Sequence, residues 1–298
     1  MRIFFKVLLS LCIAISLSSC DDDSMDNPVT NNEELTSIVE VVSLGSNTTA
    51  TRTYTINNSL NTQINTENGT NLIQTFTDGK MTMIQYFNNG GALTGTQTYT
   101  YDSNDRIVSD SSISLTANQT INRTYEYVGN QILATRTELE NDGTVTDEGS
   151  SIFTLNNNNQ IIKSESVDYN FSWEATYTNG NLSTFTDYVG NTIQGSALFS
   201  YTTELASIPY QKERYRFGSE WRNNIMLTET TNYSFKQLAE LGNNYLTNYT
   251  YTLSSDPSMT ITLTASYEFD DLGRLMNQTK NKMFFQTAIN RVLTYQFE

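Results

Sequence analysis

Hydrophobic and polar residues alternate along most of the chain, and the alternation restarts at regular intervals. In QTYTYDSNDRIVSD (97–110) and RTYEYVGNQILATR (123–136), single polar residues separate the tyrosines, and a turn rich in Asn, Asp or Gly leads to an aliphatic residue. A period of two is typical of a strand with one apolar and one polar face. The turn residues tolerate the left-handed backbone of tight hairpins. The pattern therefore predicts a series of antiparallel hairpins.

Six hairpins share an apolar anchor before the turn and an aliphatic residue that restarts the strand after it. The anchor and restart residues are Phe76 and Met81, Tyr101 and Ile107, Tyr127 and Ile132, Leu155 and Ile161, Tyr177 and Leu182, and Phe269 and Leu275. From Phe76 to Tyr177 the anchors are 25, 26, 28 and 22 residues apart. Because a lone hairpin buries its apolar face only against neighbours, we expect an all-β fold, an antiparallel meander of roughly 16–20 strands that forms a curved sheet or a barrel.

Two regions interrupt this pattern. Residues 205–224 contain Pro209, the charged run KERYR (212–216) and Trp221, which predicts a long or irregular connection.

In SFKQLAELG (234–242), Phe235, Leu238 and Leu241 have helical spacing before a terminal Gly, which predicts a short helix, with a further strand as the alternative. No linker rich in Pro, Gly or Ser divides the chain after residue 34. We therefore expect a single β-repeat domain over residues 35–298.

The N-terminus has the features of an export signal. Arg2 and Lys6 precede an apolar run over residues 7–17, which is shorter than the ~20 residues needed to span a membrane. LSSC (17–20) resembles the bacterial lipobox, in which the Cys becomes the lipidated first residue. We predict a signal peptide over residues 1–19 and lipidation of Cys20, an ordinary secretory signal being the alternative.

The residues after Cys20 form a polar tether over residues 20–34. Its start, DDDSMD (21–26), is either a solvated spacer or the acidic export signal that it resembles in Bacteroidetes surface lipoproteins. Fully extended, residues 21–34 reach about 45 Å. The chain has 2 Cys, at positions 12 and 20, so none is left for a disulfide after processing.

YEFDDLGRL (267–275) resembles the YD repeat of RHS-type proteins, whose consensus is Y-x-Y-D-x-x-G-R-L. YTYDSNDRI (99–107) resembles it as well, with Asp105 in the Gly position. RHS proteins wind many such repeats into a shell around cargo, which this chain is too short to form. When the lipobox and the repeats are considered together, the chain resembles Bacteroidetes lipoproteins of unknown function more closely than RHS proteins. Those lipoproteins carry degenerate repeats in a porin-like, many-stranded β fold. The resemblance implies a fold and a location, and no activity.

Charge and composition exclude several kinds of chemistry. The formal net charge is −15, and removal of Arg2 and Lys6 leaves 15 basic against 32 acidic residues, or −17. Such a surface disfavours nucleic acid. There is no His, which removes the usual general base and the commonest metal ligand. We expect no cofactor and no catalytic site, although paired carboxylates leave open a glycan hydrolase that uses only Asp and Glu.

Exposed aromatic rings are the remaining candidates for ligand binding. Trp173 and Trp221 are the only tryptophans, and Tyr210 and Tyr215 lie in the interrupted region. Such rings stack on sugars when exposed, and they belong to the core when buried.

We therefore predict a non-enzymatic lipoprotein displayed on the outer membrane. In this interpretation the chain is a scaffold or binding module for a glycan or a protein, held by its lipid anchor and exposed at the cell surface. The alternatives are a carboxylate-only glycan hydrolase and a membrane-embedded β-barrel. The latter is disfavoured because the alternate strand positions are Thr, Asn, Ser and Glu rather than an apolar band.

Overall fold

A computed structural model describes residues 34–298 apart from 46, 58–59, 207–222, 225–226, 228–238, 241 and 285–286. The predicted signal peptide, Cys20 and nearly all of the predicted tether lie outside the described residues. The same holds for Trp221, Tyr210 and Tyr215.

The described residues form eighteen strands. They are β1 (Leu35–Leu44), β2 (Asn47–Asn57), β3 (Leu60–Thr66), β4 (Asn71–Thr77), β5 (Lys80–Phe87), β6 (Leu93–Tyr101), β7 (Ile107–Ser114), β8 (Gln119–Val128), β9 (Gln131–Glu140), β10 (Val145–Leu155), β11 (Ile161–Ser166), β12 (Phe171–Thr178), β13 (Asn181–Val189), β14 (Thr192–Leu205), β15 (Asn244–Leu253), β16 (Thr260–Phe269), β17 (Leu275–Phe284) and β18 (Thr287–Phe297).

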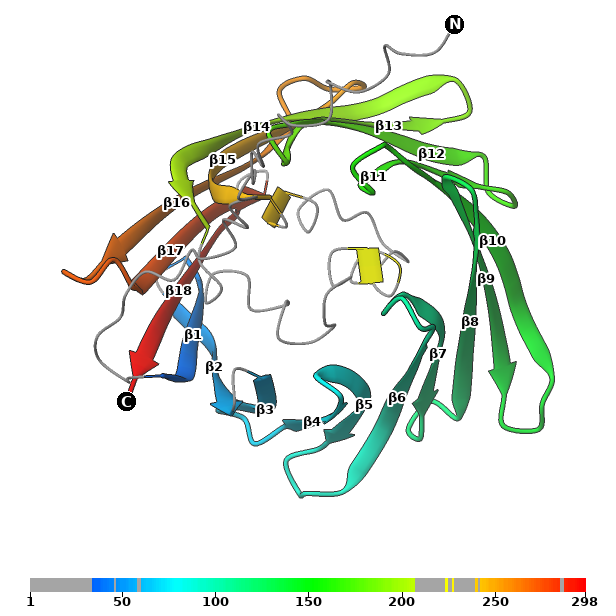
Figure 1. Cartoon of the computed structure of the whole chain (residues 1–298), viewed down its shortest axis with the longest axis horizontal. Coiled ribbons are helices and arrows are strands. Elements are labelled where there is room, and N and C mark those ends of the chain that lie inside the picture. Colours follow the sequence, from blue (N-terminus) through cyan, green and yellow to red (C-terminus); the bar gives the residue numbers. More distant parts are fainter. Residues whose placement is uncertain are drawn as a thin grey trace, which may run out of the picture. The chain divides into compact units, whose positions relative to one another are not determined.

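The strands form one closed antiparallel barrel. Each pairs with the next in the sequence, and β1 also pairs with β18, from Leu35 opposite Phe297 to Leu44 opposite Ile289. The amide of Glu34 donates to the carbonyl of Glu298 at 2.8 Å, and the reciprocal bond is 3.0 Å. Figure 1 shows the strands surrounding a common interior. The predicted all-β meander is confirmed, and of the two predicted forms the sheet adopts the barrel.

The six predicted anchor and restart pairs all lie directly opposite each other in the strand register. The restart residues are buried: Met81, Ile107, Ile132, Ile161, Leu182 and Leu275 are each 0 or 1% exposed. The hairpin alignment read from the sequence is therefore correct, and the aliphatic residue after each turn is its most buried point.

Two of these hairpins close with the same set of hydrogen bonds. The Oδ1 atom of Asp102 accepts from the amides of Asn104 and Arg106, and its Oδ2 accepts from the Arg106 guanidinium at 2.7 Å. Asp270 makes the corresponding three bonds with Leu272 and Arg274. The Asp and Arg of the repeat are thus the two ends of one turn. This local role explains their spacing without any catalytic function.

Successive repeats also bind each other through the anchor tyrosines. Three phenol groups donate to the backbone carbonyl of the preceding unit's restart residue: Tyr101 to Met81 at 2.6 Å, Tyr127 to Ile107 at 3.0 Å and Tyr177 to Ile161 at 3.0 Å. The guanidinium carbon of Arg106 lies 4.2 Å from the centre of the Tyr127 ring, within the range of a cation–π contact. The sequence period therefore corresponds to a repeating contact between neighbouring hairpins.

The strands have one buried and one exposed face. In β12, Trp173 and Ala175 are buried while Glu174 and Thr176 are exposed. The buried residues belong to a core that includes Leu227 and Ala239 from the connection between β14 and β15. In Figure 1 the short described helical segments of that connection lie inside the ring of strands, so the core occupies the inner face.

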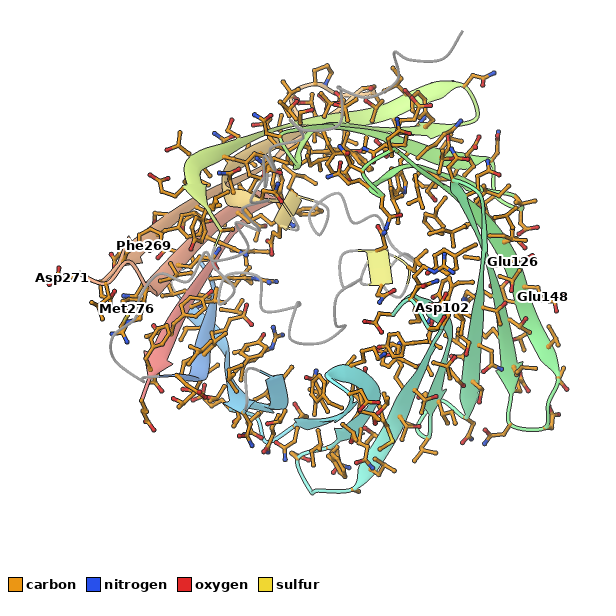
Figure 2. All side chains as sticks on the ribbon, in the orientation of Figure 1. Asp102, Glu126, Glu148, Phe269, Asp271 and Met276 are labelled. Carbon is orange, nitrogen blue, oxygen red and sulfur yellow. The ribbon has the colours of Figure 1, made fainter. Side chains whose placement is uncertain are left out.

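The outer face is lined by rows of hydroxyl and amide side chains. One row crosses six strands through Ser200, Asn248, Thr264, Asn281, Asn290 and Ser43. Another crosses five strands through Thr100, Ser109, Thr124, Thr135 and Ser150. Within it the hydroxyls of Thr100 and Ser109 are 2.6 Å apart, as are those of Thr124 and Thr135. Side chains on both faces are drawn in Figure 2.

The connection between β14 and β15 spans residues 206–243. Of the predicted helix over residues 234–242, the structure describes Ala239 and Glu240, which are helical, and Gly242, which is not. The others lie outside the described residues. No helical stretch in the described part of the chain has the length and hydropathy of a transmembrane helix.

Candidate functional site

The two ends of the barrel differ in what they carry. Both Glu34 and Glu298 lie at one end, which we call the terminal end. Successive connections of an antiparallel meander alternate between its ends. The opposite end, here the distal end, therefore carries the connections at residues 45–46, 67–70, 88–92, 115–118, 141–144, 167–170, 190–191, 254–259 and 285–286.

At the terminal end, asparagines of the long connection bind the hairpin turns. The Nδ2 atom of Asn224 donates to the carbonyl of Asp105 at 2.9 Å, and its Oδ1 accepts from the amide of Ile107 at 2.9 Å. Asn223 donates to the carbonyl of Asn159 in the same way, at 2.9 Å. Asp105 and Asn159 are both left-handed, with φ of 61° and 58°. The equivalent carbonyl of two turns is therefore held by the same kind of group.

A third turn at this end is bound similarly. Asn243 donates from Nδ2 to the carbonyl of Asn179, which has φ of 53°, at 3.2 Å. A Cβ atom on the neighbouring Gly180 would overlap the Asn243 amide. The connection between β14 and β15 is thus fixed to the terminal end of the barrel by amide side chains. The sequence pattern indicates the interruption but not this capping role, because Asn is also common in the turns themselves.

Among the described residues, three carboxylates are buried, and each accepts a hydrogen bond from a tyrosine. Asp110 accepts from Tyr125 at 2.7 Å and from Arg123 at 2.8 Å. Its proximity adds to burial in raising the pKa of the Tyr125 phenol well above its ordinary value. Glu40 accepts from Tyr54 at 2.7 Å and from Arg52 at 3.2 Å.

Asp187 is the third buried carboxylate, and its bond comes from Tyr251. Burial raises the pKa of Asp187 above its ordinary value. The three carboxylates are only 2–4% exposed. Because a general acid or base must reach its substrate, this burial favours a structural role for all three groups.

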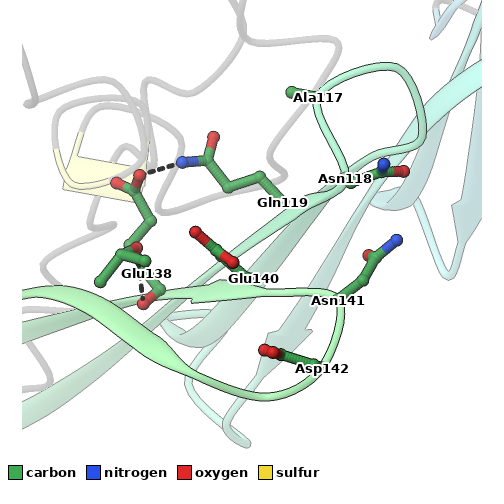
Figure 3. Close-up of a pocket in the computed structure, with 8 residues that line it drawn as sticks. Ala117, Asn118, Gln119, Glu138, Glu140, Asn141 and Asp142 are labelled. Carbon is green, nitrogen blue, oxygen red and sulfur yellow. Dashed lines mark hydrogen bonds between the residues drawn. The ribbon is translucent and has the colours of Figure 1, made fainter.

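An open groove lies at the distal end, and Figure 3 shows its lining. Its volume is about 650 Å³, and its walls come from β8, β9, the start of β10 and the connections at 115–118 and 141–144. The lining residues are Ala117, Asn118, Gln119, Glu138, Glu140, Asn141, Asp142 and Thr146. The groove therefore contains three carboxylates and no basic side chain.

A chain of polar contacts fixes the groove wall. The Gln119 amide donates to Glu138, as the dashed line in Figure 3 shows. Arg136 forms ion pairs with both Glu138 and Asp147, and the Tyr169 phenol donates to Asp147 at 3.3 Å. These contacts join β8, β9 and β10 to the connection between β11 and β12, so they hold three strands and one connection together at the distal end.

Among the residues that the structure describes, no group of three or more His, Cys, Asp or Glu side chains is arranged to hold a metal ion. The acidic groove is suited to hydrogen-bond donors and cations. The groove was not predictable from the sequence, because its residues come from three strands and two loops that become neighbours only in the sheet.

Of the residues predicted to bind ligand, the structure describes only Trp173. It is 6% exposed, and its ring centre lies 5.5 Å from that of Phe185, with the planes tilted by 33°. This burial favours the core interpretation that the sequence left open for Trp173, since no broad ring face is available for stacking a sugar.

Comparison with known proteins gives remote structural similarity. No family model matches the chain, and no curated protein matches it. A porin-like protein from Bacteroides uniformis is 16% identical, with a TM-score of 0.44 over 89% of this chain and 96% of that one. A porin-like protein from Bacteroides vulgatus is 11% identical, with a TM-score of 0.32 over 89% and 98% of the two chains.

A third similar structure is a TcdB2–TccC3–Cdc42 complex. The identity is 11% and the TM-score 0.31, over 83% of this chain and 15% of that one. At these identities and TM-scores the likeness is too remote to carry a function to this chain.

Proposed function

We propose that this protein is a non-enzymatic cell-envelope lipoprotein, a β-barrel binding module anchored to the outer membrane through Cys20. The observation that carries the proposal is the pairing of Glu34 with Glu298 at the terminal end. A tether that continues into the barrel at Glu34 joins it at that end, and in this proposal the groove at the opposite, distal end takes the glycan or protein ligand.

The rows of polar side chains on the outer face support a barrel that is surrounded by water, with single apolar residues such as Leu198, 67% exposed, among them. A membrane-embedded barrel needs a band of apolar side chains around its outer surface, whereas the rows through Asn248 and Thr124 consist of hydroxyl and amide groups. Because a closed barrel is also compatible with insertion, the alternative needs a direct test. A chain that lacks residues 1–34 retains all eighteen strands, and we expect it to remain soluble in buffer without detergent. A requirement for detergent would favour the embedded barrel.

Metabolic labelling with a fatty acid tests the anchor. We expect the wild-type chain to incorporate label and the Cys20→Ala chain to remain unlabelled and unprocessed. Labelling that persists in Cys20→Ala would refute lipidation at this position.

Protease treatment of intact cells tests surface display. If the protein stays protected while a known surface lipoprotein is cleaved, the acidic run at residues 21–26 is a spacer and not an export signal.

The carboxylate-only glycan hydrolase is the remaining alternative. Its candidates include Glu138 and Glu140, because both line the groove. We expect no release of reducing ends from a panel of polysaccharides. Release that Glu138→Gln or Glu140→Gln abolishes would establish the hydrolase instead.

A further inference from the structure

The ring of Tyr169 is exposed on the inner face of the barrel at its distal end. Tyr169 lies in the connection between β11 and β12, and it is 59% exposed. Its phenol donates to Asp147 at 3.3 Å, and a Cβ atom on Gly149 would lie 3.9 Å from its ring. Asp147 and Gly149 belong to the same face of β10 as the buried Phe153, because alternate residues of a strand share a face. The ring therefore lies against β10 from the inside, and most of it stays open to a ligand.

The acidic groove has its carboxylates on this same inner face. Glu138 lies directly opposite Asp147 in the strand register, and Glu140 is the next residue of β9 on that face. Arg136 forms ion pairs with both Glu138 and Asp147. Because Asp147 also accepts from Tyr169, the exposed ring stands beside the wall of the groove.

The ring and the groove together have the chemistry of a sugar site. An aromatic ring offers an apolar face with a polar edge, and a pyranose can lay its C–H groups on such a face. Glu140 and Asp142 are exposed in the groove lining (Figure 3), where they can accept hydrogen bonds from sugar hydroxyls. The side chains of Asn118 and Asn141 can both donate and accept there. A concave site with a few polar groups beside an apolar surface is typical of small-ligand binding.

The charge and polarity of the lining decide which class of ligand fits. Ala117 is the only apolar residue of the groove lining, so an apolar ligand would find little surface to cover. The lining has three carboxylates, and Arg136 beside it is already paired with Glu138 and Asp147. An acidic ligand would therefore be repelled. A neutral ligand rich in hydroxyl groups can donate hydrogen bonds to the carboxylates and needs no counter-charge.

We propose that this inner face of the distal end binds a neutral glycan. One pyranose ring stacks on Tyr169, and hydroxyls of a neighbouring unit donate to Glu140 and Asp142 in the groove. The ion pairs of Arg136 fix the groove wall relative to the ring. The inference rests on the proposed function and deepens it, because it names the class of ligand that the groove takes.

Titration calorimetry of the purified full-length protein, in a mild detergent without a sugar headgroup, tests the proposal. The neutral probes are maltohexaose, cellohexaose, mannohexaose and xylohexaose. A galacturonic acid hexamer is the acidic reference, and a glucosamine hexamer is the cationic one. We expect saturable one-to-one binding of at least one neutral probe, and about tenfold weaker binding of the galacturonic acid hexamer.

Variants of exposed residues separate the ring from the carboxylates. Tyr169→Ala should weaken binding of the neutral probe about tenfold because the stacking surface is lost, whereas Tyr169→Phe should stay within about twofold of the wild type. Glu140→Gln/Asp142→Asn should also weaken it about tenfold, because neutral amides accept hydrogen bonds more weakly than carboxylates. The matched controls are Val167→Ala in the same connection and Glu148→Gln on the outer face of β10, both exposed, and these should bind as the wild type does.

Several results would overturn the proposal. These are no saturable binding of any neutral probe, a preference for the galacturonic acid hexamer, and a loss in Val167→Ala as large as in Tyr169→Ala. Binding of the glucosamine hexamer alone would assign the groove to an amine instead of a sugar ring.

Failure of this inference and failure of the proposed function give different results. If no neutral probe binds while fatty-acid labelling depends on Cys20, the glycan site is refuted and the lipoprotein stands. If a neutral probe binds through Tyr169 while Cys20→Ala still incorporates fatty acid, the glycan site stands and the anchor assignment fails.

Discussion

The Tyr251 phenol lies 3.1 and 3.2 Å from the two carboxylate oxygens of Asp187, although the whole of β14 separates their strands. Gly195 is the residue of β14 that pairs with Asp187. Gly195 has no side chain, so the Tyr251 ring can cross β14 directly above it. A Cβ atom at position 195 would overlap the phenol. This contact joins three strands of the barrel, and it requires glycine at the middle position.

Gly195→Ala should therefore destabilise the barrel by about 2–3 kcal/mol, because the added methyl group forces Tyr251 away from Asp187. Urea unfolding followed by fluorescence measures this loss. Gly149→Ala is the matched control: its φ is not in the left-handed region and its nearest atom is the Asp168 carboxylate at 3.6 Å, so it should change stability little. Equal losses of unfolding free energy in Gly195→Ala and Gly149→Ala would contradict the passage of the Tyr251 ring over Gly195.

Asp187→Asn should change how stability depends on pH. Burial raises the pKa of Asp187, so the folded state disfavours its ionised form. Its contribution is therefore most favourable below the ordinary pKa of 3.8 and is lost as the pH rises through the raised folded value. The unfolding free energy of Asp187→Asn, relative to that of the wild type, should rise across this window in a series of urea titrations. A relative stability that falls with pH would mean that the carboxylate is stabilised when ionised.

Asp270→Ala should cost about 1 kcal/mol, because the amides of Leu272 and Arg274 and the Arg274 guanidinium lose their acceptor. Burial alone would raise the pKa of Asp270, but these hydrogen bonds outweigh it and place the pKa below its ordinary value. The contribution is therefore present at neutral pH and is lost as the pH falls through the lowered folded pKa.

The control for this turn is the neighbouring residue. Asp271 is exposed, and Figure 2 shows it extending from the end of the hairpin. We expect Asp271→Ala to leave the unfolding midpoint in urea nearly unchanged. If Asp271→Ala is as costly as Asp270→Ala, net charge rather than the turn geometry decides the effect.

Asn224→Ala tests the cap at the terminal end. Asn224 is 0% exposed, and its removal leaves the Ile107 amide and the Asp105 carbonyl without these bonds, which should cost about 2–3 kcal/mol. Calorimetry measures the loss, and Asn157→Ala is the control because Asn157 is exposed in a turn at the same end. An unchanged transition in Asn224→Ala would show that the connection does not contribute to stability.

The hairpins are predictable because the information they need is local. The period of two assigns alternate residues to the two faces, and the turn composition places each reversal within a few residues. For this reason the sequence pattern alone pairs Phe269 with Leu275 correctly, and the two residues lie opposite each other in the strand register. The polar outer face follows from the same alternation.

Contacts between distant strands could not be predicted. Nothing near Leu35 indicates that it pairs with Phe297, so the sequence left a curved sheet and a barrel equally open. The indole ring of Trp173 is a side chain that could stack on a sugar, but the fold buries it in the core. The groove and the Tyr251–Asp187 contact depend on the register of nonadjacent segments, which short-range periodicity does not encode.

The sequence by itself determined that this is a repeating β protein with one wet face, whereas the export signal and the lipidation of Cys20 that it predicts remain predictions. Only the tertiary structure decided that the sheet closes, that the apolar face is the inner one and that the long connection is fixed to the terminal end. The physical reason is that strand formation depends on neighbours along the chain, whereas closure depends on hydrogen bonds and packing between residues far apart in it.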